Sequence, residues 1–159
     1  MKKLPVFLAI LVVALVAYSM TEWSKTRSLV ASQNFTTETR SVAEFTKIEV
    51  ASAFQVDVTY SSEESVSIEA PDNLQNYIDL KVKSGTLHIS FKKNTSVNSN
   101  CALKVHITTT KLNDFELSGA SSVALNNSLK DNNFKIESSG AASFKGELAV
   151  ENADIELSG

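Results

Sequence analysis

Short runs of alternating apolar and polar residues fill the chain from residue 42 onward. In each run the apolar residues take every second position, and Glu, Gln, Asp, Ser, Lys, His or Thr stand between them. Alternation with a period of two is typical of a β-strand with one buried face and one solvated face. The pattern predicts half-buried strands at Ile48–Val50, Phe54–Val58, Val66–Ile68, Leu80–Val82, Leu87–Phe91 and Leu103–Ile107.

Three stretches interrupt this alternation. "PDNLQNYIDL" (71–80) has Asp72 or Asn73 in position to cap a helix and apolar residues at helical spacing after them, which predicts one short helical turn. "KNTSVNSN" (93–100) has the composition of a polar loop, and "KSG" (83–85) that of a hairpin turn.

One short motif occurs repeatedly in the last third of the chain. "ELSGASSV" stands at 116–123, "ESSGAASF" at 137–144 and "ELSG" at 156–159. An apolar residue lies four positions before the glycine of each copy, which predicts a unit of strand, tight glycine corner and strand. The predicted structural corners are Ser118, Gly119, Ser139, Gly140, Ser158 and Gly159.

A period of about 20 residues with one corner per unit is what a β-solenoid requires. Each coil then stacks its inward side chains on those of the next, about 4.8 Å away. The sequence therefore predicts an all-β fold, a β-solenoid or single-stranded β-helix with an N-terminal strand-rich half.

The segment 1–19 has the parts of an export signal. Lys2 and Lys3 precede the apolar run "LPVFLAILVVALVA", and the segment 17–19, Ala-Tyr-Ser, puts small residues where a signal peptidase cleaves. Cleavage before Met20 is expected. The alternative is an uncleaved anchor, because Leu4 to Met20 just reaches the roughly 17 residues that span a bilayer. Residues 20–39, rich in Ser and Thr, are expected to be a linker that becomes ordered towards its end.

Composition narrows the function classes. The chain has 159 residues, 43% of them hydrophobic, and a formal net charge of -3. That is enough for one globular domain and excludes a strongly basic nucleic-acid binder. Cys101 is the only cysteine, so no internal disulfide can form, and we expect it to pack as a small apolar side chain.

The recurring serine does not have the surroundings of a nucleophile. A nucleophile elbow needs Gly two residues before the Ser, but Glu116, Glu137 and Glu156 occupy those positions. A nucleophile is also needed once, whereas this serine recurs with every unit. The sequence predicts no catalytic residue and no cofactor site, and it assigns the serines a structural role.

Metal binding is not predicted either. His88 and His106 each stand between two apolar residues, so both lie on the polar face of a strand, and no Asp, Glu or Cys recurs at ligand spacing. The glycine-rich nonapeptide of calcium-binding β-rolls is missing, and the pair Glu63-Glu64 has the character of a solvated turn.

A polysaccharide lyase would need clustered carboxylates and a basic residue to abstract a proton. The only arginines, Arg27 and Arg40, precede most of the strands. The aspartates are scattered one to a strand or turn, at Asp57, Asp72, Asp79, Asp114, Asp131 and Asp154. This distribution disfavours a lyase.

The segment from Thr37 to Gly159 resembles the head GIN domain family, described as adhesin heads of autotransporters. The resemblance is carried by Arg40 with Phe45, the segment 73–78, the turn 85–87 (Gly-Thr-Leu) and the Ser-Gly corners. It implies a pectin-lyase-like β-helix and a role in adhesion, without established catalysis. Ser138 stands where the pattern prefers Leu or Ile, and the chain ends within a motif, so a head domain over 40–159 is expected to be truncated at its C-terminal end.

Together these features predict a non-enzymatic, exported cell-envelope protein located in the periplasm, in the outer membrane or on the cell surface. The expected role is an adhesin head that binds a surface glycan or a cell-surface protein. Trp23 is the only tryptophan, which leaves little aromatic surface for stacking on sugars. The alternatives are an envelope scaffold that self-associates and, less favoured, a polysaccharide-active enzyme. No nucleic-acid partner is expected, and membrane contact only through an uncleaved N-terminal segment.

Overall fold

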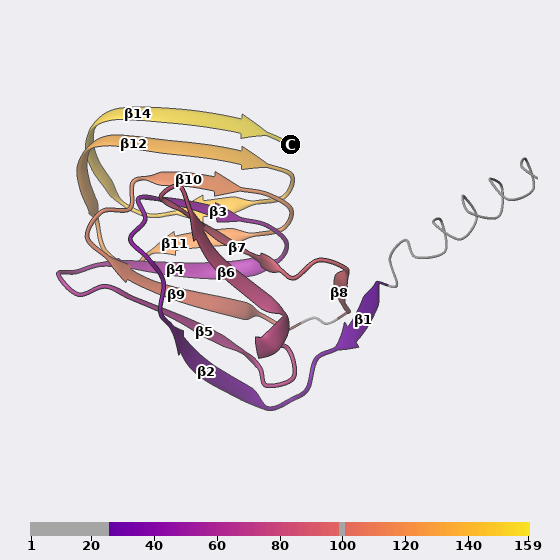
Figure 1. Ribbon diagram of the computed structural model, residues 1–159. Coiled ribbons are helices and arrows are strands. Elements are labelled where there is room, and N and C mark those ends of the chain that lie inside the picture. The colour runs from indigo at the N-terminus through magenta and orange to yellow at the C-terminus, as the bar shows by residue number, and fades with distance from the viewer. Residues whose placement is uncertain (1–25, 99–100) are drawn as a thin grey trace, which may run out of the picture.

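The computed structural model describes residues 26–98 and 101–159, and within them the fold is all-β (Figure 1). Most strands belong to two six-stranded sheets, and neither sheet closes into a barrel in this part of the chain. The predicted export signal at 1–19 and its cleavage site lie outside the described residues.

The first sheet, which we call the β14 sheet, is parallel except at one edge. Its strand order is β14 (Leu148–Ser158), β12 (Leu129–Ser139), β10 (Asp114–Leu117), β3 (Lys47–Val50), β7 (Thr86–Phe91) and β6 (Ile78–Lys83). Neighbours from β14 to β7 run parallel, and β6 pairs with β7 antiparallel.

The second sheet, the β13 sheet, has the same organisation. Its order is β13 (Ser143–Lys145), β11 (Ser122–Leu125), β4 (Phe54–Tyr60), β9 (Leu103–Thr109), β5 (Ser65–Pro71) and β2 (Phe35–Arg40). Strands β13 to β9 are parallel, whereas β5 and β2 pair antiparallel. The chain passes from the β14 sheet to the β13 sheet after β3, β10 and β12, so the parallel partner of a strand always comes from another part of the sequence.

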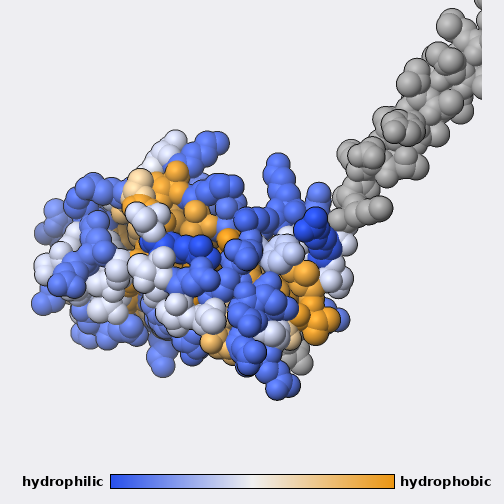
Figure 2. Space-filling view, turned by 60° about the horizontal axis from the view of Figure 1, so that its bottom comes forward, coloured by the Kyte–Doolittle hydropathy of each residue, from blue (hydrophilic) through white to orange (hydrophobic). Residues whose placement is uncertain are grey.

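The two sheets bury their alternating apolar residues against each other. The fully buried side chains include Phe54 and Phe115 from opposite sheets. The ring of Phe115 lies 5.7 Å from that of Phe134 in β12 and 5.1 Å from that of Phe144 in β13, so aromatic contacts cross the interior. Outside this core the face shown in Figure 2 is mostly hydrophilic, and its hydrophobic areas are separate from one another.

The strands expected from alternation are confirmed as β3, β4, β5, β6, β7 and β9. The hairpin turn is confirmed as well. Ser84 and Gly85, between β6 and β7, have φ values of 51° and 79°, the left-handed pair that a two-residue hairpin turn requires.

The helical turn is present as a 3-10 turn, Gln75–Tyr77, but the predicted cap is wrong. Its N-cap residue is Leu74, and no side chain caps it. Asn73 instead hydrogen-bonds the loop between β1 (Arg27–Val30) and β2: its Nδ2 donates to the Val30 carbonyl at 2.8 Å, and its Oδ1 accepts from the Ser32 amide at 3.0 Å. This long-range partner takes the side chain away from the nearby helix end.

Two polar stretches form more regular structure than their composition predicts. Thr95–Asn98, expected to be loop, forms β8 and pairs in parallel with β1, so the loop assignment is wrong for these residues. Within the stretch expected to be a linker, residues 27–30 and 35–39 belong to β1 and β2. Backbone pairing supplies the hydrogen bonds here, and it does not depend on an apolar pattern.

In the described residues no helix is long and apolar enough to cross a membrane.

Cys101 is partly buried and packs against the hydrophobic core, which agrees with its expected apolar role.

Candidate functional site

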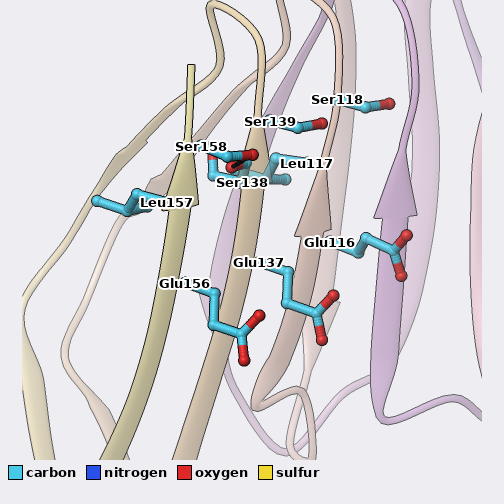
Figure 3. Close-up of a pocket in the computed structure, with 9 residues that line it drawn as sticks. All are labelled: Glu116, Leu117, Ser118, Glu137, Ser138, Ser139, Glu156, Leu157 and Ser158. Carbon is cyan, nitrogen blue, oxygen red and sulfur yellow. Dashed lines mark hydrogen bonds between the residues drawn. The ribbon is translucent and has the colours of Figure 1, made fainter.

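Parallel pairing in register arranges the polar side chains of the β14 sheet in columns. One column holds the first residue of each repeated motif, Glu116, Glu137 and Glu156, and Glu49 of β3 extends it. Figure 3 shows the carboxylates of Glu116, Glu137 and Glu156 pointing to the same side of their strands. Because adjacent strands are about 4.8 Å apart, these like charges lie close together.

A second column lies two residues further along the strands and holds Ser118, Ser139 and Ser158. The two columns line a shallow groove of about 270 Å³, to which Leu117, Ser138 and Leu157 also contribute. In Figure 3 the side chain of Leu157 points away from the carboxylates, as expected for alternation along a strand. We call this groove and its two columns the Glu-Ser face.

Two lysines offset the repulsion within the glutamate column. Lys47 Nζ lies 2.9 Å from a carboxylate oxygen of Glu116, and Lys135 Nζ lies 2.7 Å from one of Glu137. The hydrogen bond to Glu116 raises the pKa of Lys47, and the hydrogen bond from Lys135 lowers the pKa of Glu137. Glu156 has no ion pair within the described part of the chain, so the column is neutralised unevenly.

Asp114, next to this face, has a carboxylate oxygen, Oδ1, that is buried without a hydrogen-bond partner in the described residues. Burial raises the pKa of Asp114, although Lys47 opposes the shift. Lys47 Nζ is 3.9 Å from that oxygen and much closer to Glu116. The short hydrogen bond to Glu116 therefore favours the charged form of Lys47. At Asp114 the more distant lysine does not offset the burial, so the charged form is disfavoured.

The Ser-Gly pairs lie where the chain leaves the β14 sheet. Gly119 and Gly140 have φ values of +75° and +80°, and Gly159 has +149°. The backbone amide and the Oγ of Ser118 both donate to the Val50 carbonyl, at 2.9 and 3.3 Å. Ser158 Oγ donates to the Ser138 carbonyl at 3.5 Å. Two of the three serines thus hydrogen-bond the backbone of the neighbouring strand.

Sequence reasoning missed a further member of the corner column. "EVASAFQV" (49–56) aligns with "ELSGASSV", because Glu49 pairs with Glu116 and Val56 with Val123, at the same separation along the chain. Ser52 occupies the glycine position and has a φ of 77°. The glutamate, the apolar residue after it and the alternation beyond the corner were the available signals. The absence of Ser-Gly at this corner obscured them.

The two histidines lie on the outer faces of different sheets and are about one third exposed. His88 Nδ1 is 2.8 Å from Glu49, where it continues the glutamate column. His106 lies between two carboxylates, with Nδ1 3.4 Å from Asp57 and Nε2 3.5 Å from Glu69. The sequence analysis correctly placed both rings on the polar face but did not foresee their carboxylate partners.

The strand pairing also puts Ser67 opposite His106, so that a serine, a histidine and an aspartate stand on three neighbouring strands. An activated serine needs a hydrogen bond to the histidine. Here His106 Nε2 faces Glu69 instead, and no hydrogen bond from Ser67 to His106 occurs in the described residues. Across residues 26–98 and 101–159, no group of three or more His, Cys, Asp or Glu side chains is arranged to hold a metal ion.

A protein-family model matches residues 44–159, and it is described as "Putative auto-transporter adhesin, head GIN domain". No curated protein matches this sequence.

Several solved structures are similar. A structure described as a putative adhesin from Bacteroides fragilis has 26% sequence identity and a TM-score of 0.74, and the match covers 82% of this chain and 62% of that one. A putative adhesin from Parabacteroides distasonis has 20% identity and a TM-score of 0.69 over 81% of this chain and 58% of the other. A putative lipid binding protein from the same species has 16% identity and a TM-score of 0.67 over 81% and 65%. The chain thus spans less than two thirds of the length of these relatives.

Proposed function

Because this chain belongs to the head GIN domain family of putative auto-transporter adhesins, we propose that it is the non-enzymatic binding head of an exported adhesin. The observation that carries the proposal is the Glu-Ser face, where carboxylates and hydroxyls recur at the spacing of the strands. Such an array offers the same weak contact several times to a partner with repeated donors. Many weak contacts on one rigid face give avidity without a deep pocket.

The repeated array follows from a β-helix, which is the second part of the proposal. The pairs β3/β4, β10/β11 and β12/β13 each contribute one strand to each sheet, and successive pairs stack in parallel register. This path is that of a coil with one strand on each of two faces. The antiparallel strands β6, β5 and β2 then form the strand-rich end of the coil.

Export rests on the sequence of the segment 1–19 together with family membership. Positive charge, an apolar run and small residues at 17 and 19 suit cleavage before Met20 and release from the cytoplasm. Determination of the mature N-terminus decides between cleavage and an anchor. A chain that keeps Met1 in the envelope would contradict cleavage.

The adhesive role is tested with beads that carry the purified chain and are washed over bacterial and animal cells. We expect more beads to be retained than with an inert protein of similar charge. Glu137→Gln together with Glu156→Gln should reduce retention several-fold, because both changes remove column charge while keeping side-chain shape. Glu147→Gln together with Glu151→Gln, on exposed residues outside the groove, removes the same number of charges and is the matched control. Retention no better than with the inert protein would contradict the proposal.

A further inference from the structure

A second groove lies next to the Glu-Ser face on the same three strands, β10, β12 and β14. It has a volume of about 380 Å³ and is lined by residues 113–114, 133–135 and 152–154. The groove of the Glu-Ser face is lined by residues 116–118, 137–139 and 156–158. Each strand therefore passes from one groove directly into the other. We call the second one the Asn groove, after Asn133 and Asn152.

The polar side chains of both grooves point to the same side of the sheet. Phe115 and Phe134 are 0% and 2% exposed, so they point into the core. The residues on either side of an inward residue point outward along a strand. By this alternation and the strand register, the outward side chains of the Asn groove are those of Asp114, Asn133, Lys135, Asn152 and Asp154. The glutamates of the Glu-Ser face, two residues beyond the row of Asp114, point the same way.

Together the two grooves form one open band that runs along the strands. From Asn152 to Ser158 this band is about 20 Å long, at about 3.3 Å per residue. Figure 3 shows its second half, where the glutamates and then the serines follow one another along the same three strands. A linear molecule that lies along the strands can contact both grooves at once.

The band presents mainly hydrogen-bond acceptors. Its carboxylates accept hydrogen bonds and cannot donate them. Ser118 and Ser158 already donate their hydroxyl protons to backbone carbonyls, which leaves their oxygens as acceptors. Asn152 Nδ2 donates to Asn133 Oδ1 at 3.3 Å, which leaves the Asn152 oxygen as an acceptor. A molecule that pairs with this band must therefore be rich in donors.

The charge of the band is negative, and it is least neutralised on β14. Lys47 and Lys135 pair with the glutamates of β10 and β12, at 2.9 and 2.7 Å. Asp154 and Glu156, one in each groove, are exposed and have no lysine or arginine within ion-pair distance among the described residues. The segment 147–159 contains no Lys or Arg at all. A cationic donor on the partner would supply the missing counter-charge.

We propose that the two grooves together bind a linear glycan whose sugars carry free amino groups. Its protonated amines donate to the carboxylates of both grooves, and its hydroxyls donate to the serine and asparagine oxygens. Such a polymer repeats its donors along its length, as the band repeats its acceptors. The inference rests on the proposed adhesive role, for which it names the partner.

Other linear partners fit this band less well. A glycan of uronic or sialic acids would place carboxylates against carboxylates. An extended peptide would bring main-chain carbonyls that need donors, and the band has few donors to give. The main chain of β10 and β12 cannot supply them, because both edges of each strand are already paired within the sheet.

Titration calorimetry on the purified chain at mildly acidic pH tests the chemistry of the partner. The probes are a β-1,4-linked glucosamine tetramer, the same tetramer with every amine acetylated, the glucosamine monomer, a galacturonate tetramer and tetralysine. We expect the glucosamine tetramer to bind several-fold more tightly than each of the others, and added salt to weaken its binding. Equal binding of the acetylated tetramer would show that the amines are not recognised. Equal binding of tetralysine would show that any polycation binds. Either result would overturn the proposal.

Variants of β14 test whether both grooves take part. Asp154→Asn and Glu156→Gln each remove one charge from one groove, and each should weaken binding of the glucosamine tetramer several-fold at an unchanged melting temperature. Glu147→Gln with Glu151→Gln, on exposed residues outside both grooves, is the matched control and should leave binding unchanged. If either groove variant binds as the wild type does, or the control weakens binding as much, the joint site is wrong.

The outcome also separates this assignment from the adhesive role. If wild-type beads adhere to cells while the glucosamine tetramer does not bind, the glycan assignment fails and the adhesive role stands. Specific binding of the tetramer without adhesion of beads would support the assignment and contradict the adhesive role.

Discussion

Gly140 lies against the backbone of Gly119 so closely that a Cβ atom on Gly140 would come within 2.9 Å of the Gly119 carbonyl oxygen. The same oxygen accepts a hydrogen bond of 2.8 Å from the amide of Ala141. The two corners therefore stack through their backbones, and the second corner has no room for a side chain. This contact gives the recurring glycine a packing reason in addition to its positive φ.

The glycine contact predicts unequal costs for four substitutions. Gly140→Ala and Gly119→Val should each lower the free energy of unfolding by about 1 to 3 kcal/mol, because backbone atoms occupy the space that the new atoms need. Gly85→Ala should cost less, since Gly85 has a similar φ of +79° but nothing within 4 Å of its Cβ position. Ser118→Ala should be mild. Urea unfolding measures all four, and an equal or larger cost at Gly85 would contradict the stacking account.

The backbone conformation of Ser52, at the first corner, predicts that a change to glycine stabilises the protein there. Ser52 has a φ of 77°, a conformation in which a side chain is strained, and it is exposed. Ser52→Gly should therefore raise the free energy of unfolding by about 0.5 to 1 kcal/mol. Ala53→Gly, at the exposed residue next to it, is the control and should destabilise the protein. A loss of stability in Ser52→Gly as large as that in Ala53→Gly would show that the corner assignment of Ser52 is wrong.

Asp114 predicts how stability depends on pH. Burial raises its pKa in the folded protein, so the folded state binds this proton more tightly than the unfolded state does. The stabilisation is complete below the ordinary Asp pKa of about 4 and is lost as pH rises through the raised value. Asp114→Asn should thus unfold less readily than the wild type at pH 7, and the difference should vanish as pH approaches about 4. Asp154→Asn, on exposed β14, is the control. A difference that grows with acidity would contradict the assignment.

The strands and the hairpin were predictable because they depend on local alternation and on residues that tolerate a left-handed backbone. Phe54, Val56 and Val58 are buried in the core. Alternation predicts this whichever strands pair with β4. The partners themselves were not predictable from alternation. Both β5 and β9 alternate in the same way, yet β9 pairs in parallel with β4 and antiparallel with β5. Strand direction depends on the path of the chain, which a period of two does not encode.

Contacts between distant segments account for what the sequence did not predict. Asn73 is of a residue type that commonly caps helices, but its side chain donates a hydrogen bond to the carbonyl of Val30, 43 residues away. The carboxylate partners of His106 lie on β4 and β5, and the Asn groove exists only because β10, β12 and β14 stack in register. The residue type determines what each side chain can do, but its neighbours follow from the fold. The columns of the Glu-Ser face are easier to relate to the sequence, because they consist of the repeated motif itself.

The central claim is that the Ser-Gly motifs stack in register to build one continuous surface, and disulfide cross-linking tests it most directly. Ser122 of β11 is the register partner of Ser143 of β13. With Cys101→Ala as background, Ser122→Cys with Ser143→Cys should form an internal disulfide under mild oxidation, because adjacent strands are about 4.8 Å apart. Ser122→Cys with Lys145→Cys, two residues out of register and about 8 Å apart, should not. Cross-linking of the second pair but not the first would contradict the claim.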